Sequence, residues 1–143
     1  MGGDLTLQVA ATTSRQLRVG SAPQPWEVAW VLWHYVDNSH FYYFIPKPNG
    51  WELGKADPAY SGAQRFLATG TTPAFALGTW HQITVTQSGQ TIQVSANGMP
   101  VVTFTDRERP YSSGRIGLYS EDAEVYFDNV SVTTSTGKGR KGR

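Results

Sequence analysis

The chain has 143 residues, which suits one domain with a hydrophobic core of its own. It has no cysteine, which excludes disulfides, thiolate zinc sites and cysteine nucleophiles. Four of its 12 basic residues lie in the last six positions, and without them the net charge is −3, which argues against nucleic-acid binding by the folded domain.

Short strand-like stretches separated by turn signals follow one another along the chain. They are expected at residues 4–11, 15–19, 26–36, 40–45, 51–55, 64–69, 81–87, 90–96, 101–105, 115–119 and 125–133. Residues 26–36 are nearly all apolar, which favours a central strand covered on both faces. Asn97-Gly98 is the strongest turn signal, because this pair suits a tight hairpin.

Many short strands and the lack of any long helical pattern predict an all-β fold, a two-sheet antiparallel sandwich of the jelly-roll kind. We expect one domain over residues 1–134 and a disordered basic tail over residues 135–143. The expected core includes Ile83, Val85, Ile92, Val94, Ile116, Leu118 and Phe127.

Four segments in the last half of the chain carry a recognisable pattern. They read GTWHQITV at 78–85, IQVSANG at 92–98, SGRIGLY at 113–119 and VYFDNVSV at 125–132. In this order they resemble the concanavalin A-like lectin and glucanase superfamily, above all its laminin-G-like modules and the domain related to 3-keto-disaccharide hydrolases. The resemblance implies a curved sheet whose concave face meets sugars, and a structural calcium ion near the closing strand.

The resemblance also implies one strand ahead of the first strand seen in this sequence. Without that strand, the sandwich would have an open edge through which the chain could dimerise. No apolar run reaches the length of a membrane span, and positions 1–4 lack the basic and apolar regions of a signal peptide. We therefore expect a module of a larger extracellular or cell-surface protein.

Aromatic residues gather between positions 26 and 51, and polar residues interrupt the strands that follow. Large aromatic rings stack on the C–H faces of sugars, while carboxylates, amides and basic groups bind the hydroxyls. Strict alternation would place Trp33 and Tyr35 on one sheet face, opposite Trp30 and Leu32. The candidate sugar-binding residues are Trp33, Tyr35, Tyr43, Trp51, Glu52, Lys55, Gln64 and Arg65.

Non-catalytic binding of a poly- or oligosaccharide is the preferred function, and two alternatives stay open. A glycoside hydrolase needs two facing carboxylates, and the E-x-D-x-x-E strand motif of the superfamily's glucanases is missing. A polysaccharide lyase could use a histidine or tyrosine as its base or acid, and a laminin-G-like module would bind proteins instead. The acidic residues that could hold calcium are Asp106, Glu121, Asp122 and Asp128.

Overall fold

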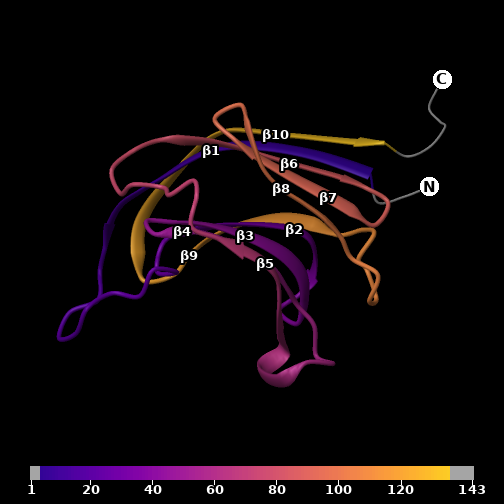
Figure 1. Cartoon of the computed structure of the whole chain (residues 1–143), viewed down its shortest axis with the longest axis horizontal. Coiled ribbons are helices and arrows are strands. Elements are labelled where there is room, and N and C mark those ends of the chain that lie inside the picture. The colour runs from indigo at the N-terminus through magenta and orange to yellow at the C-terminus, as the bar shows by residue number, and fades with distance from the viewer. Residues whose placement is uncertain (1–3, 136–143) are drawn as a thin grey trace.

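The computed structural model describes residues 4–135 and consists of two packed five-stranded antiparallel sheets (Figure 1). The predicted jelly-roll sandwich is thus confirmed. Of the predicted tail, residues 136–143 lie outside the described residues.

Sheet A contains β1 (Asp4–Gln16), β6 (His81–Ser88), β7 (Thr91–Ala96), β8 (Met99–Thr105) and β10 (Ala123–Ser135), in the order β10-β1-β6-β7-β8. Sheet B contains β2 (Ala29–Asp37), β3 (His40–Lys47), β4 (Gly50–Ala56), β5 (Gln64–Gly70) and β9 (Arg115–Ser120), in the order β5-β4-β3-β2-β9. A short 3-10 turn, η1 (Ser61–Ala63), joins β4 to β5.

The main core fills the space between the sheets. Alternate residues of β1, β6 and β7 point inward, as the period-2 pattern predicts, and Leu7, Val9 and Ile83 are fully buried. They meet the inner face of sheet B, where Trp33, Tyr42, Phe44, Trp51 and Leu53 are buried. Of the expected core, Ile116 and Phe127 are only partly buried, and Leu118 is exposed because it lies on the edge strand β9.

The first strand, β1, pairs with the closing strand, β10. β1 runs antiparallel to β10 over almost its whole length, from Asp4 opposite Ser135 to Gln16 opposite Ala123. The separate strands predicted at residues 4–11 and 15–19 are not both present, because β1 runs without a break from Asp4 to Gln16. β9 is an edge strand of sheet B and β10 is an edge strand of sheet A, and the two follow each other in the chain.

A bulge in β2 changes which residues share a face. His34 adopts a positive φ of 48°, and the register against β9 shifts between Leu32 and Tyr35. Trp33 therefore points into the core, whereas Tyr35 points outward with Trp30 and Leu32. The expectation that Trp33 and Tyr35 share a face is wrong, because the extra residue reverses the alternation after position 34.

Candidate functional site

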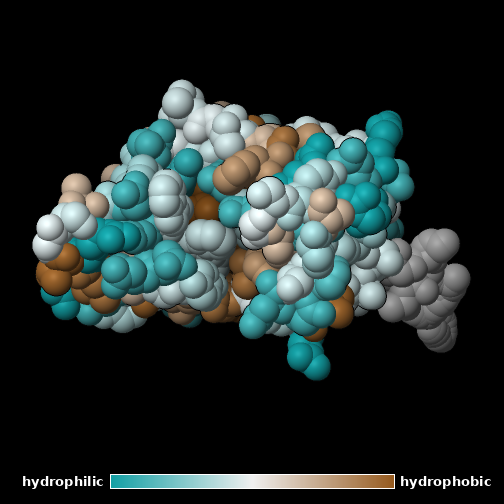
Figure 2. Space-filling view, turned by 90° about the horizontal axis from the view of Figure 1, so that it is seen from below, coloured by the Kyte–Doolittle hydropathy of each residue, from teal (hydrophilic) through white to brown (hydrophobic). Residues whose placement is uncertain are grey.

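The outer face of sheet B, turned away from the core, carries a second apolar cluster. Val28, Leu32, Tyr43 and Ile45 are buried there, with Trp30, Tyr35 and Phe41 packed against them. Three loops project on this side of the sandwich, after β1, between β4 and β5, and between β8 and β9 (Figure 1). Figure 2 looks onto this face and shows hydrophobic atoms in a hollow between hydrophilic rims. The sheet is thus the floor of a recess rather than an exposed plane.

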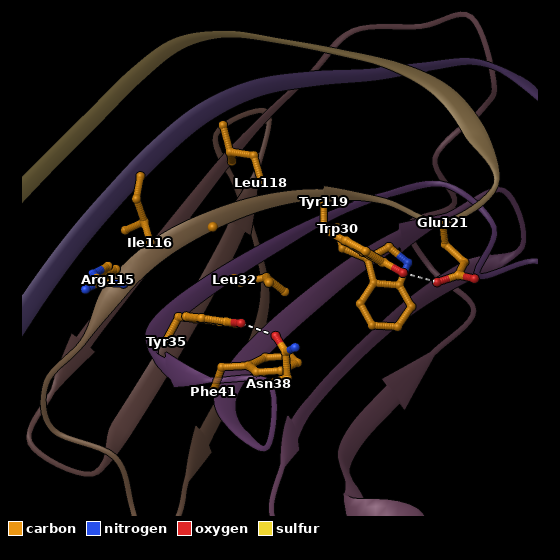
Figure 3. Close-up of a pocket in the computed structure, with 11 residues that line it drawn as sticks. Trp30, Leu32, Tyr35, Asn38, Phe41, Arg115, Ile116, Leu118, Tyr119 and Glu121 are labelled. Carbon is orange, nitrogen blue, oxygen red and sulfur yellow. Dashed lines mark hydrogen bonds between the residues drawn. The ribbon is translucent and has the colours of Figure 1, made fainter.

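The first cavity of this face lies over β2, β3 and β9 and has a volume of about 610 Å³. In Figure 3, Trp30 and Tyr119 stand at one end, and Tyr35 and Phe41 stand at the other. The rings of Tyr35 and Phe41 are stacked with centroids 5.4 Å apart. Trp30 meets the ring of Tyr119 edge-on at 5.5 Å. These rings offer flat apolar surfaces to a ligand lying across the sheet.

Polar groups stand at the ends of the first cavity. The hydroxyl of Tyr35 donates to Asn38, and that of Tyr119 donates to Glu121 (Figure 3). The hydrogen bond to the Glu121 carboxylate, together with burial, raises the pKa of Tyr119 to about 12, so this phenol stays protonated near neutral pH. The guanidinium of Arg115 stands opposite Tyr35 across the β2–β9 pair and is exposed. The cavity therefore offers a carboxylate, Glu121, and a guanidinium, Arg115, at separate points.

The second cavity, of about 390 Å³, adjoins the first and shares Trp30 and Glu121 with it. Its other lining residues come from β3, β4, β5 and the loop before β2, and they are Trp26, Ile45, Lys47, Glu52, Gln64 and Phe66. The Lys47 ammonium lies 3.8 Å from Oε1 of Glu52. Because the cavities share Trp30, one extended ligand could occupy both.

Tyr43 contacts both the aromatic rings on the outer face of sheet B and the polar groups of the second cavity. Its hydroxyl donates to Oε2 of Glu52 at 2.7 Å and accepts from Nε2 of Gln64 at 2.7 Å. Its ring lies 5.0 Å from that of Trp30 and passes directly over Gly54, where any Cβ atom would overlap the phenol. Burial, more than the nearby Glu52 carboxylate, raises the pKa of Tyr43 well above its usual range. A glycine at position 54 is thus what lets the ring lie flat.

Three of the eight predicted sugar-binding residues line the two cavities, namely Tyr35, Glu52 and Gln64, and a fourth, Tyr43, is buried beneath them. Trp33 and Trp51 lie on the inner face instead. The indole N–H of Trp33 donates to Gln87, and that of Trp51 donates to the carbonyl of Thr72, so both are satisfied within the core. These two positions need to be removed from the predicted site, because their strands turn them toward sheet A.

Lys55 also points inward, and it is fully buried. Its ammonium lies 2.8 Å from Oδ2 of Asp106 and 3.5 Å from Oδ2 of Asp57, and it donates to the carbonyl of Glu108. Arg65 forms an ion pair with Glu108 nearby. Lys55 and Arg65 therefore hold the β8–β9 loop against the end of β4 and β5, and they do not face the recess.

The acids proposed for calcium do not come together. Asp106 binds Lys55 and accepts the hydroxyl of Tyr42, Glu121 and Asp122 lie in the turn between β9 and β10, and Asp128 lies on β10. Within residues 4–135, no group of three or more acids and histidines is close enough to hold a metal ion. Calcium binding stays a prediction without a site among the described residues.

Sequence reasoning named none of Trp30, Phe41, Tyr119 or Lys47 as site residues, although all line the recess or its floor. Trp30 and Phe41 alternate with core residues, so period 2 could have assigned them to the outer face once the inner set was known. Tyr119 lies beyond the reach of local patterns, because its approach to Trp30 depends on the pairing of β9 with β2.

Solved structures with this fold include sugar-binding proteins. The carbohydrate binding module CBM66 from Bacillus subtilis aligns at a TM-score of 0.73 and 16% identity over 92% of this chain and 75% of its own. A variant of human galectin-16 aligns at 0.69 and 13% identity over 94% and 91%. Domain 4 of AbnA, a GH43 extracellular arabinanase from Geobacillus stearothermophilus, solved with arabinotriose, aligns at 0.60 and 11% identity over 92% and 60%. At such identities the likeness shows the fold alone.

The topology and the motifs of the last strands define a jelly-roll sandwich of the concanavalin A-like class. Within this class, residues 16–133 match the family model of the 3-keto-alpha-glucoside-1,2-lyase-like domain, and the chain belongs to that family. No curated protein matches the sequence. No helix among the described residues has the length and hydrophobicity to span a membrane.

Proposed function

We propose that this domain is a non-catalytic carbohydrate-binding module and that its sugar lies across the outer face of sheet B. The observation that carries the proposal is the pair of adjoining cavities that share Trp30. A pyranose or furanose ring has an apolar face and a rim of hydroxyls. It matches a floor of aromatic rings with polar groups at the margins better than a purely apolar ligand would.

The polar groups of the second cavity suit hydroxyl recognition. Glu52 is only 6% exposed, and its Oε2 accepts a hydrogen bond from the Tyr43 hydroxyl. Its Oε1, which lies 3.8 Å from the Lys47 ammonium, would accept a hydrogen bond from a sugar hydroxyl. Lys47 provides a donor on the same side. Glu52 lines the second cavity, and a hydrogen bond from a ligand hydroxyl to a carboxylate is stronger than one between neutral groups, so a ligand that donates to Glu52 gains affinity.

The two cavities together favour an oligosaccharide or a polysaccharide segment over a single sugar. Each has a volume within the range of small-molecule sites, about 300–1,000 Å³. Their shared residue, Trp30, would stack on the sugar unit at the centre, with neighbouring units over Phe41 on one side and Glu52 on the other. Structural similarity to CBM66, to galectin-16 and to a domain solved with arabinotriose supports the same function and favours a module of a secreted protein.

Glycan binding by the wild type and two tryptophan variants tests the proposal. Trp30→Ala should raise the dissociation constant at least about tenfold, since a buried aromatic contact contributes about 1.5–3 kcal/mol. Trp80→Ala is the matched control, because Trp80 is half exposed and lines neither cavity. A glycan array identifies the ligand and calorimetry measures the affinity. Equal binding by both variants, with both folded, would disprove the placement of the site.

The name of the family favours lyase chemistry as a second candidate function. We propose Glu52 as the base in that case, because it lines the second cavity. In that reaction, Oε1 of Glu52 takes the proton from C2 of a 3-keto-α-glucoside. The C1–O bond then breaks, a C1=C2 double bond forms, and the leaving oxygen takes a proton from water or the Lys47 ammonium. No oxidant or reductant is needed. The observation in favour is that Glu52 is nearly buried yet faces the cavity.

Release of the aglycone from a 3-keto-α-glucoside distinguishes the two candidates. Activity that Glu52→Gln abolishes, while thermal unfolding is unchanged, would establish the lyase. Sugar binding by a wild type that releases no aglycone would support the non-catalytic module. Trp80→Ala again serves as the control, since it should change neither aglycone release nor sugar binding by much.

A further inference from the structure

The arginines among the described residues differ in whether a carboxylate neutralises them. Four of them form ion pairs, namely Arg15, Arg18, Arg65 and Arg109. Within residues 4–135, Arg107 and Arg115 form no ion pair and donate no side-chain hydrogen bond. Of these two, only Arg115 lines either of the two cavities of the recess. The first cavity therefore contains a cation that the described part of the chain leaves without a partner.

The start of β9 places Arg115 at the Tyr35 end of this cavity. Gly114 has a φ of 142°, and a Cβ atom there would lie 2.4 Å from the backbone carbonyl carbon of His34. Glycine is therefore what lets β9 begin close against the bulge in β2. The same bulge turns Tyr35 outward, where it stands opposite Arg115 in the β2–β9 pair. In Figure 3 these two residues lie at one end of the cavity and Glu121 lies at the other, so the cation is held apart from the carboxylate.

Hydrogen-bond donors gather at the Arg115 end of the cavity. The Tyr35 hydroxyl donates to the side-chain oxygen of Asn38, and the amide nitrogen of Asn38 has no partner within residues 4–135. Asp37, the carboxylate next to Asn38 in the chain, pairs with His40 and lines neither cavity. Among the described lining residues, this end therefore presents N–H groups and no carboxylate.

The chemistry of this end fits an acidic sugar better than a neutral one. A guanidinium donates two parallel hydrogen bonds to a carboxylate, and such charge-assisted bonds are about twice as strong as bonds between neutral groups. The stacked rings of Tyr35 and Phe41 lie at the same end and offer a flat surface to the apolar face of a sugar ring. A hexuronic acid combines both requirements, because its carboxylate is attached to the sugar ring itself.

We propose that the first cavity is a subsite for a hexuronic acid unit, whose carboxylate binds Arg115 and whose ring lies against Tyr35 and Phe41. This inference rests on the proposed sugar-binding function and names the class of sugar that is bound. The Glu121 carboxylate at the other end disfavours a second acidic group there and accepts hydrogen bonds from hydroxyls instead. The expected ligand is thus a glycan in which an acidic unit stands beside neutral units.

Calorimetry with matched pairs of short oligosaccharides tests this subsite. One member of each pair carries a single glucuronic or galacturonic acid unit beside neutral units, and the other is its methyl ester, which keeps the skeleton and removes the charge. The wild type should bind the acid at least about tenfold more tightly than the ester. Arg115→Gln should remove this preference. Arg107→Gln changes the other exposed arginine without an ion pair in the described part of the chain, and it should keep the preference.

Thermal unfolding shows whether each variant is folded. Equal binding of acid and ester by the wild type, or binding of neutral glycans alone, would overturn the subsite. So would a loss of preference in Arg107→Gln as large as that in Arg115→Gln, since it would indicate general attraction between charges. In all three cases, sugar binding that Trp30→Ala weakens would still support the proposed function. A folded wild type that binds no sugar, acidic or neutral, would overturn that function and the subsite with it.

Discussion

Lys55 offers a direct test of how the β8–β9 loop is held in place. We consider the substitution Lys55→Met, which keeps most of the aliphatic stem and removes the ammonium. Lys55 is fully buried between Asp106 and Asp57, and it donates to the carbonyl of Glu108. After the substitution, the carboxylate of Asp106, itself 1% exposed, loses its nearest cation.

The expected loss of unfolding free energy depends on which partners the Asp106 carboxylate retains after the substitution. The carboxylate still accepts the Tyr42 hydroxyl at 2.8 Å and the backbone N–H of Glu108 at 3.0 Å, which limits the penalty. The carbonyl of Glu108 loses a donor, which adds to it. Removing one partner of a buried ion pair costs about 3–5 kcal/mol, and we expect a loss of unfolding free energy in this range.

Urea unfolding followed by tryptophan fluorescence measures the effect, provided that the m-value is unchanged. In the double variant Lys55→Met, Asp106→Asn, no unpaired charge remains, so its cost should be smaller than the sum of the single costs by about 1–3 kcal/mol. Arg107→Met, at an exposed neighbouring position, is the control and should cost under about 0.5 kcal/mol. A cost below about 1 kcal/mol for Lys55→Met, or strictly additive costs, would refute this account of the cluster.

Trp51→Ala should destabilise the fold by about 3–5 kcal/mol in urea unfolding, because the indole is a core side chain. A variant with unchanged stability and lower sugar affinity would instead place Trp51 in the binding site. Gly54→Ala should weaken sugar binding about tenfold or more and cost about 1–3 kcal/mol of stability, since the new methyl overlaps the buried Tyr43 ring; calorimetry and thermal unfolding check the two effects. Burial opposes the ionisation of Asp57, but the backbone N–H of Ala59 and the Arg109 guanidinium outweigh it and lower the pKa of the carboxyl. The resulting stability is present above the ordinary pKa of about 3.9 and is lost as the pH falls through the lower folded-state value, so Asp57→Asn should flatten the dependence of stability on pH below about 4. Calcium chelation should leave the unfolding temperature unchanged, because the described acids do not converge; a shift upon adding EDTA would show a site that the geometry does not suggest.

The strands could be predicted because their signals are local. Alternation identified the inward residues of β6 and β7, and Asn97-Gly98 marked the turn before β8. The order of strands within each sheet could not be read in this way. That order depends on pairings between segments far apart in the chain, such as β1 with β10, and local patterns do not report them.

The site was predicted less well, for a physical reason that differs from residue to residue. At Trp33 and Tyr35 the error came from the bulge at His34, since one inserted residue turns every later side chain of the strand to the other face. At Lys55 the error came from the expectation that a charge inside a strand faces solvent or a ligand. The carboxylates that neutralise it lie two and 51 positions away, and only the folded chain brings Asp106 to it.

β4 shows why folding and binding can be separated in this domain. Its residues are all buried, yet the two faces of the strand have different neighbours. Trp51, Leu53 and Lys55 point inward and hold sheet B to the core and to the β8–β9 loop, whereas Glu52 and Gly54 point outward beneath the recess. Under the proposed function, alternate positions of one strand therefore carry stability and recognition. Substitutions at the odd positions should then be detected first by unfolding, and those at the even positions first by sugar binding.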